Sequence, residues 1–353
     1  MNDEGKLSSE IHEKIFKQRI EAKMLASTRA LESGEQPVAI FLGGQPGSGK
    51  GGLARKTMEE LSAEKTVHID VDNLRENHPS YRSWQRDPAT EKIAADLSHA
   101  DASAWGKSLF SSAIANRRNI MIDGTLGNPQ STEKQINTLK DAGYEVTVRA
   151  LAVQPEVSHL GVLKRFEEGV QKGAPRWVPR EVEASAYEGL PKTLQLVEST
   201  QTDAPIQVQV FDRNKSKLYD NRDTSIASQT TAEQALKTER QRPLNASEQQ
   251  SYSKDWDMVI TSMAQRQAPG QEIKEAAKLA EQMCPDRKLS VAGAASIDSK
   301  AAQPDLAQKS TKQVTADTLA SLSMPATPSS KLLGKIAEPP SPAANESSNL
   351  KLK

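Results

Sequence analysis

Short apolar runs alternate with helical patterns between about residues 35 and 220 of this 353-residue chain. The apolar runs are rich in β-branched residues, which is typical of buried strands, and the segments between them carry apolar residues at helical spacing. This alternation predicts an α/β fold with a mostly parallel sheet, helices on both faces and ligands at the carboxyl ends of the strands. The expected strands are Ala39–Leu42, Thr66–Ile69, Asn119–Ile122, Val146–Val153 and Ile206–Phe211. The expected helices lie near Gly52–Leu61, Ala102–Ala115, Thr132–Ala142, Val157–Gly169 and Glu181–Glu198.

Helical patterns also flank this region. Residues 8–32 have helical periodicity, and Ser8 and Ser9 are candidate N-caps. Later helical patterns lie near 230–240, 246–266 and 270–284, in a segment rich in Gln, Ala, Glu and Lys. The last part is rich in Ala, Ser, Pro and Lys and poor in large apolar residues, so we expect it to be disordered. We therefore divide the chain into an N-terminal helical segment (1–34), an α/β domain (35–222), a helical extension (223–290) and a disordered tail (291–353).

The role of the region after about residue 225 is open from the sequence. A solvated extension of little energetic consequence is our default interpretation, because the segment is polar. A partner-binding segment and a secretion address are the alternatives.

The segment VAIFLGGQPGSGKGGL (residues 38–53) predicts a phosphate-binding loop between a strand and a helix. Its glycines let successive backbone N–H groups converge on one anion, and the following helix points its positive end at the same place. Lys50 supplies a cation for the outer phosphates of ATP or GTP. The alternative is an ordinary tight turn. The residues expected to contact the nucleotide are Gly44, Gln45, Pro46, Gly47, Ser48, Gly49, Lys50 and Gly51.

One position departs from this motif. Gly51 stands where a Ser or Thr usually contacts Mg²⁺, as a glycine also does in adenylate kinases. We therefore expect Mg²⁺ to be held by phosphates, water and carboxylates further along the chain.

Acidic residues follow two of the expected strands. Asp70 and Asp72 follow the second strand, where Asp72 is the candidate catalytic base and Asp70 can orient metal-bound water. Asp123 closes the third strand as in a Walker B arrangement and is the candidate magnesium ligand, with Thr125 beside it at the substrate site. The alternatives are a helix cap for the first pair and an Asp-Gly turn for the second.

Two arginines are candidates for neutralising the negative charge of a phosphoryl group during its transfer. Arg165 lies in a helical pattern, and Arg176 lies in the proline-flanked segment GAPRWVP, where a mobile closing element could carry them. The alternative for each is a solvated surface charge.

The composition limits the classes of binding partner that we expect. Lys plus Arg and Asp plus Glu both number 46, so the formal net charge is zero and argues against nucleic acid or an anionic membrane as a partner. The single cysteine, Cys284, excludes an internal disulfide framework. The charged N-terminus has no apolar core like that of a signal peptide, so we expect a cytoplasmic protein, with delivery into another cell left open.

In order along the chain, FLGGQPGSGK, IDVDNLRENHPSY, IMIDGT, LGVLKRFE, APRWVP and VFDRNKSKLYD resemble the zeta toxin family of bacterial kinases, over roughly residues 30–220. The resemblance implies a P-loop kinase-like core. It further implies ATP- or GTP-dependent phosphorylation of UDP-N-acetylglucosamine at the sugar 3′-hydroxyl, which blocks cell-wall precursor synthesis. A small helical antitoxin that blocks the nucleotide site is the implied partner.

By the same resemblance, Lys50 matches the phosphate-loop lysine, Asp72 the catalytic base, and Arg165 and Arg176 the arginines that contact phosphates. Asp123 and Thr125 match an acid and a threonine at the substrate and metal site. Ungapped alignment puts Lys107 where members carry a substrate-binding glutamate, and Asp101 is a candidate replacement. Two other functions stay open: a phosphotransferase for another small-molecule or nucleotide acceptor, and a non-catalytic nucleotide-binding protein.

Overall fold

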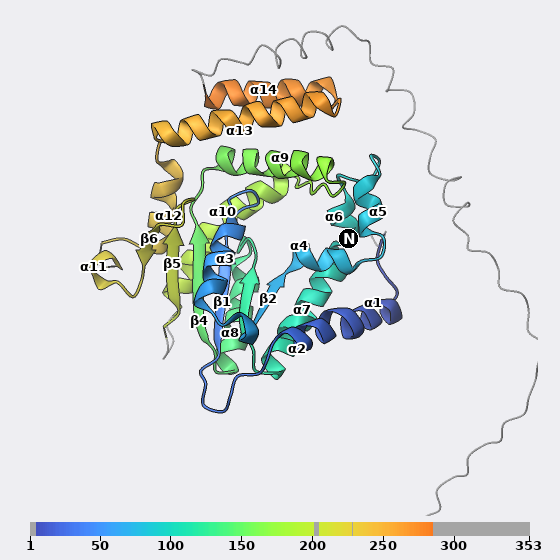
Figure 1. Cartoon of the computed structure of the whole chain (residues 1–353). Coiled ribbons are helices and arrows are strands. Elements are labelled where there is room, and N and C mark those ends of the chain that lie inside the picture. The colour runs from blue at the N-terminus through green and yellow to red at the C-terminus, as the bar shows by residue number, and fades with distance from the viewer. Residues whose placement is uncertain (1–4, 201–204, 228, 285–353) are drawn as a thin grey trace, which may run out of the picture. The chain divides into compact units, whose positions relative to one another are not determined.

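The computed structural model describes residues 5–200, 205–227 and 229–284, and it contains one six-stranded sheet (Figure 1). The strand order is β2-β3-β1-β4-β5-β6, and all neighbouring pairs are parallel except β5 with β6. The predicted parallel sheet is confirmed, whereas the four-residue β6 was not predicted because it is too short to show a pattern. The predicted tail, 291–353, lies outside the described residues. The strands are β1 Val38–Gly43, β2 Thr66–Asp70, β3 Asn119–Asp123, β4 Glu145–Leu151, β5 Gln207–Phe211 and β6 Lys217–Asp220.

Each predicted helix between the strands is present, and three further short α-helices and a 3-10 turn lie between β2 and α7. The N-terminal helical segment ends at Ser27, earlier than expected, and contains the π-helical turn Phe16–Glu21. The helices before β5 are α1 Ser9–Ile15, α2 Ala22–Ser27, α3 Lys50–Glu60, α4 Val71–Leu74, α5 Tyr81–Arg86, α6 Ala94–Leu97, α7 His99–Ala115, α8 Pro129–Asp141, α9 Pro155–Gln171 and α10 Arg180–Ser199. Those after β6 are α11 Thr224–Ala227, α12 Ala232–Gln241, α13 Ala246–Gln265 and α14 Gly270–Met283. None of these described helices has both the length and the apolar character needed to cross a lipid bilayer.

Both faces of the sheet are buried. Successive side chains of a strand point to opposite faces, and in β1 the side chains on each face belong to a core. In β1, Ala39 and Phe41 belong to a core with residues of the N-terminal helices, α7, α8 and α10. Ile40 and Leu42 belong to a second core with residues of α3, α9, α13 and α14. The near-continuous apolar sequence of β1 follows from this double burial.

The C-terminal helices are part of this packing. Helix α13 lies along α9, and α14 lies along α13 (Figure 1). Trp256 of α13 is 1% exposed and belongs to the same core as Leu42. The expectation of a solvated extension of little energetic consequence is therefore wrong for these helices, because residues 252–263 place an apolar stripe at helical spacing against α9. The domain boundary at residue 222 stays a prediction.

We expect Trp256→Ala to lower the free energy of unfolding by about 3–5 kcal/mol, because it empties a large buried volume. Met258, on the same helix, is 40% exposed, and Met258→Ala should change stability by no more than about 0.5 kcal/mol. Urea unfolding of both full-length variants measures this difference. Equal, small losses would show that α13 does not contribute to the core.

Candidate functional site

The segment between β1 and α3 has the conformation of a phosphate-binding loop. Gly47 and Gly49 have φ angles of 77° and 93°, in the left-handed region that favours glycine. A Cβ added to Gly47 would lie 1.9 Å from the carbonyl oxygen of Ser158 on α9, so no side chain fits there. Helix α3 begins at Lys50, directly after the loop, and directs its positive end at the space above it.

A buried side chain anchors the loop. Gln45 Nε2 donates hydrogen bonds to the Val153 carbonyl (2.7 Å) and Ser158 Oγ (3.2 Å). Gln45 Oε1 accepts from Nη2 of Arg240 on α12, at 3.1 Å. The buried Arg240 guanidinium also donates to the Tyr187 carbonyl and lies 3.9 Å from the centre of the Tyr187 ring. Arg240 was not predicted as a site residue, because it lies 195 positions from Gln45 and outside any motif.

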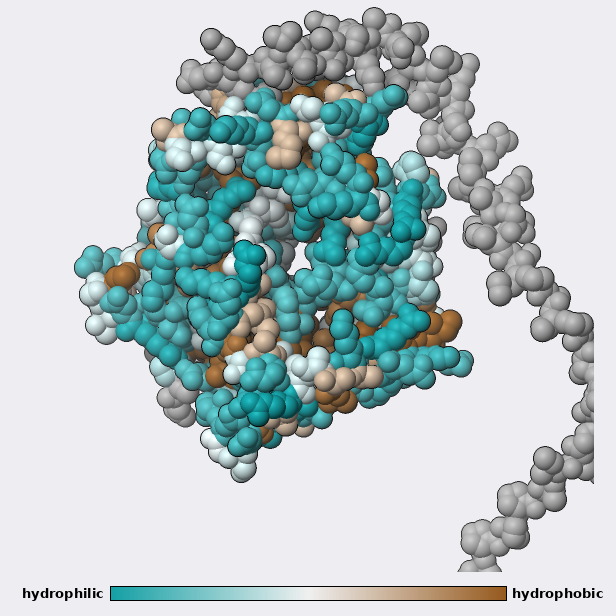
Figure 2. Space-filling model, in the orientation of Figure 1, coloured by the Kyte–Doolittle hydropathy of each residue, from teal (hydrophilic) through white to brown (hydrophobic). Residues whose placement is uncertain are grey.

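A cavity of about 480 Å³ opens beside the loop at the carboxyl ends of β1, β2 and β3. Figure 2 shows the hollow near the middle of the face, between α9 and α4. The parallel sheet explains why acids that are distant in sequence meet here, since strand ends share one edge. The predicted residues that line this cavity are Pro46, Lys50, Asp70, Asp72, Asp123, Thr125, Arg165 and Arg176.

Asp72 lies at the start of α4 and is paired with an arginine. Its Oδ1 accepts a hydrogen bond from Nε of Arg75 at 3.1 Å. Burial favours a higher pKa for Asp72, but the positive charges of Arg75 and Arg165 outweigh it, and the net pKa is lowered. Asp72 is therefore an ionised hydrogen-bond acceptor at neutral pH. Arg75 is buried and was not predicted as a site residue, although its i, i+3 spacing from Asp72 was the available signal.

Asp123 and Lys50 form the half-buried charged centre of the cavity. Burial raises the pKa of Asp123, and the nearby Lys50 opposes that effect. Burial likewise lowers the pKa of Lys50, against the attraction of Asp123 and Asp72. The Lys50 ammonium donates to the Gly44 carbonyl at 2.8 Å, so it is folded back on the loop. The charges of the Asp123 carboxylate and the Lys50 ammonium are thus not fully compensated by the groups around them.

Asp70 has a structural role and also lies in a potential ligand cluster. Its Oδ1 accepts from the Asp72 backbone N–H at 2.9 Å, which is the helix cap considered as an alternative above. Asp70 is the register partner of Asp123 on the neighbouring strand. One ligand atom from each of His68, Asp70 and Asp123 lies within 4.8 Å of the others. The carboxylate oxygens suit Mg²⁺, while His68, two positions before Asp70 on the same face, was not predicted.

The remaining predicted residues supply hydrogen-bonding groups and positive charge. Thr125 Oγ1 accepts from the Gly127 N–H at 3.2 Å and still has its own proton to donate. Arg165 lines the cavity from the packed helix α9, so it does not need a mobile lid to carry it there. Arg176 lies in the loop before α10, with Nη2 3.6 Å from Glu76 Oε1.

Two buried donors in this region have no hydrogen-bond partner within the described part of the chain. They are the Ser48 hydroxyl in the loop and Nε of Arg165. Leaving a buried polar group unpaired is costly, so both positions fit an anion that is bound in the loop and the adjoining cavity. This observation supports a phosphate-bearing ligand independently of the motif.

Asp101, the candidate replacement for the glutamate that the resemblance implies at position 107, does not take that place in the structure. Asp101 is buried under the N-terminal segment, where it accepts from the Leu7 N–H at 3.0 Å and contacts His12 Nδ1 at 2.5 Å. It does not line the cavity. Lys107 is exposed and borders a smaller hollow that also reaches Asp123.

Comparisons with known proteins agree with this geometry. The Zeta toxin family model matches residues 21–224. Toxin PezT of Streptococcus pneumoniae serotype 4 is 28% identical over 223 residues, covering 63% of this chain and 86% of PezT. Toxin zeta of Enterococcus hirae is 27% identical over 226 residues, covering 63% of this chain and 77% of that toxin.

A solved structure from the PezAT chromosomal toxin–antitoxin system of S. pneumoniae has the same fold. It superposes with a TM-score of 0.60 at 23% identity, over 74% of this chain and all of that chain. The family match covers more than half of the chain and includes the phosphate loop together with all the predicted cavity residues. This chain therefore belongs to the zeta toxin family.

Proposed function

We propose that this protein is an ATP- or GTP-dependent kinase that phosphorylates UDP-N-acetylglucosamine on the sugar 3′-hydroxyl and so blocks cell-wall precursor synthesis. The observation that carries the proposal is that Lys50, Asp72 and Arg165 meet in one cavity beside the phosphate loop. The unpaired Ser48 hydroxyl and Arg165 Nε support a phosphate ligand there. Family membership supports the sugar nucleotide as acceptor.

Each of these residues has a separate role in the phosphoryl transfer. The loop N–H groups and Lys50 hold the outer phosphates, and Asp72 accepts a hydrogen bond from the acceptor hydroxyl. A bond forms between that hydroxyl oxygen and the γ-phosphorus while the bond from phosphorus to the leaving diphosphate breaks. The hydroxyl proton passes to Asp72 and then to solvent. Arg165 and Arg176 stabilise the charge on the transferred group.

Asp123 and Asp70 would hold Mg²⁺, which would neutralise phosphate charge and orient the oxygens. The oxygen donors of both residues fit this ion, and water and phosphate oxygens would complete its coordination. Gly51 contributes no hydroxyl. Thr125 would donate a hydrogen bond to the substrate at the same edge of the cavity.

The proposed partner is a small helical antitoxin that covers the nucleotide site in the cytoplasm. The solved structure named above is from a toxin–antitoxin system. Expression of this chain with and without a Lys50→Ala change tests whether the activity is toxic.

A different acceptor is the second candidate function. Exposed Lys107 borders the hollow beside Asp123, where it reverses the charge that the family resemblance implies. A screen of UDP-sugars, nucleosides and small alcohols with labelled ATP separates the two acceptors. Nucleotide binding without turnover of any acceptor would favour the non-catalytic alternative.

We expect Lys50→Ala and Asp72→Asn each to lower kcat/KM about 100-fold or more, because one removes charge stabilisation and the other the hydrogen-bond acceptor. Arg55→Ala is the matched control, since Arg55 is exposed on the same helix as Lys50. The assay follows transfer of labelled phosphate from ATP to UDP-N-acetylglucosamine.

Full activity of Asp72→Asn would remove Asp72 from the reaction. Loss in Arg55→Ala equal to that in Lys50→Ala would mean that α3 itself had been disturbed.

We expect metal-free Asp123→Asn protein to be more stable than the parent at neutral pH. Because the folded-state pKa of Asp123 is raised, the folded chain binds this proton more tightly than the unfolded chain. The free energy of unfolding of the parent therefore falls as pH rises from the ordinary carboxyl pKa, about 3.9, through the raised value. The variant lacks this titration, so its advantage should grow over that window and then stay constant.

Urea unfolding in EDTA from pH 4 to 8 measures this advantage, with the exposed Asp141→Asn as the control. An advantage of Asp123→Asn that shrinks with rising pH would contradict the electrostatic account.

A further inference from the structure

The loop that carries Arg176, residues 172–179, joins α9 to α10 and is bound from two helices. A Cβ added to Gly169 on α9 would lie 2.7 Å from Cα of Pro175, so the loop turns back directly against that helix. The Pro175 carbonyl also accepts a hydrogen bond from Nε2 of the buried Gln85, on α5, at 2.7 Å. The backbone is therefore held in place directly before Arg176.

Trp177, directly after Arg176, is held through its ring and lines the same cavity. The ring packs edge to face on that of the buried Phe166 of α9, with 5.3 Å between the ring centres. Nζ of Lys92 lies 5.1 Å from the centre of the Trp177 ring, which is the distance of a cation–π contact. Lys92 lies just before α6, which also lines the cavity. Arg176 is thus flanked by a fixed backbone and a fixed ring.

Lys92 is itself bound by the first turn of α14. Its Nζ donates to Oε1 of Glu272 at 2.5 Å, across 180 positions of sequence. The other oxygen of Glu272, Oε2, lies 3.4 Å from Nη2 of Arg266, directly after α13. Both partners lie beyond residue 224, where the family match ends.

Arg266 joins the turn between α13 and α14 to α9. Its Nε lies 3.0 and 2.8 Å from the two carboxylate oxygens of Glu167, and Nη2 donates to Oε1 at 2.8 Å. Glu167 is buried and follows Phe166, whose ring centre lies 5.5 Å from the Arg266 guanidinium. A two-pronged contact of this kind fixes orientation as well as distance. Ion pairs therefore alternate in charge from Glu167 to Lys92, and both ends of this chain reach the pair of aromatic rings beside the loop.

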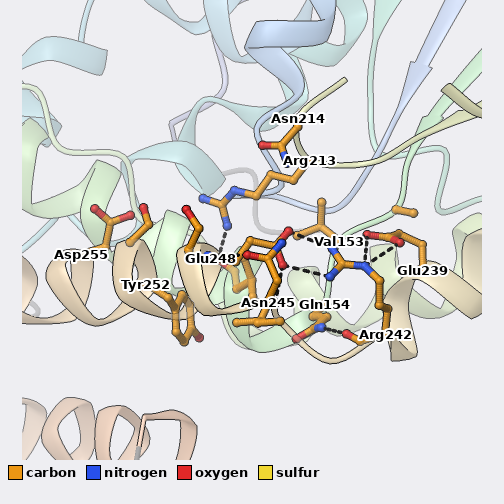
Figure 3. A pocket seen from close by; sticks show the side chains of 15 residues that line it. Val153, Gln154, Arg213, Asn214, Glu239, Arg242, Asn245, Glu248, Tyr252 and Asp255 are labelled. Atoms are coloured by element: carbon orange, nitrogen blue, oxygen red, sulfur yellow. Dashed lines mark hydrogen bonds and ion pairs between the residues drawn. The ribbon is translucent and has the colours of Figure 1, made fainter. Parts of the chain in front are cut away.

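The rest of α13 is anchored by further ion pairs, so the turn that follows it has a fixed support. Nη2 of Arg242 lies 2.9 Å from Glu239, near the end of α12, and 2.9 Å from Glu248, in the first turn of α13 (Figure 3). Asp255, also labelled in Figure 3, lies midway along α13 and pairs with Lys164 of α9 at 2.6 Å.

We infer that Lys92, Glu272 and Arg266 are positioning residues of the proposed kinase. They hold Trp177 and, through it, the neighbouring Arg176 at the edge of the cavity. The inference rests on the proposed function, because it assumes that Arg176 stabilises the charge on the transferred phosphoryl group. A cation that is fixed before the reaction needs no reorganisation when that charge develops. The turn between α13 and α14, outside the family match, would then set the place of a catalytic arginine.

We expect Lys92→Met and Glu272→Ala each to lower kcat about fivefold or more, because small displacements of a catalytic group are costly. The KM for ATP should stay within about twofold of the parent value, because Arg176 acts on the transition state and the loop holds the nucleotide. Glu281→Ala, exposed on α14, is the matched control. The assay follows labelled phosphate from ATP to UDP-N-acetylglucosamine in full-length protein. Urea midpoints should match the parent, because the Lys92–Glu272 pair is half-exposed.

The Arg176→Ala background separates positioning from a general disturbance of the fold. If Lys92 acts through Arg176, adding Lys92→Met to Arg176→Ala should change kcat by less than about twofold. Lys92→Arg should keep kcat within about twofold of the parent, because arginine also pairs with Glu272 and stacks on an aromatic ring.

In an active parent, a loss caused by Lys92→Met that is as large without Arg176 as with it would overturn the inference and leave the proposed function intact. Parent-like kcat in both Lys92→Met and Glu272→Ala would overturn it in the same way. A parent that transfers phosphate to no UDP-sugar, nucleoside or alcohol would instead overturn the proposed function, and the role of Arg176 with it.

Discussion

The contact between two glycine backbones, Gly47 in the phosphate loop and Gly161 on α9, is the constraint on which the site depends. A Cβ on Gly161 would lie 2.3 Å from the Gly47 carbonyl oxygen, so neither position accepts a side chain. The contact holds α9 against the loop. Arg165 lies one helical turn further along α9, about 6 Å along its axis. A cation is thereby fixed beside the loop by backbone packing.

Charge is the second organising feature of the site. Asp123 and Lys50 are drawn toward their neutral forms by burial, even though they attract each other. The pKa of Asp72 is lowered because the positive charge of Arg75 compensates its negative charge. Asp72 therefore needs no opposite charge from a ligand, in contrast to Lys50 and Asp123. A nucleotide with its metal would supply an anion for Lys50 and a cation for Asp123 together. Groups whose pKa values are shifted and that share one cavity are typical of a functional site.

Much of the fold could be predicted, because buried parallel strands leave a local signature. Strands β1, β2, β3 and β5 end at or just before a glycine or an acid, whereas β4 is followed by Ala152. Strand ends converge on one edge in such a sheet. The assignment of Asp70, Asp72 and Asp123 to a common place follows from that rule alone. The short helices α4 to α6 could not be predicted, because four to six residues carry too little periodicity.

Contacts between distant segments could not be predicted either. From the sequence, Asp101 was a candidate acid for the substrate site. In the structure it joins α7 to the N-terminal helix through His12, and no local pattern encodes this contact. The hydrogen bond from Arg240 to Gln45 joins residues 195 positions apart. His68 could have been found from its i, i+2 spacing to Asp70, but one exposed histidine on an edge strand is weak support without the fold.

The C-terminal helices connect stability with the site. Helix α13 buries Trp256 in the core that also contains Leu42, directly before the loop, and α12 carries Arg240 to Gln45. Losing α12 would leave the buried Gln45 oxygen without its donor, in a place where an unpaired polar group is costly. The conformation of the phosphate loop therefore depends on residues outside the family match. A helical segment that is polar in composition can thus be needed both for the core and for the loop, because a few residues at the right spacing face inward.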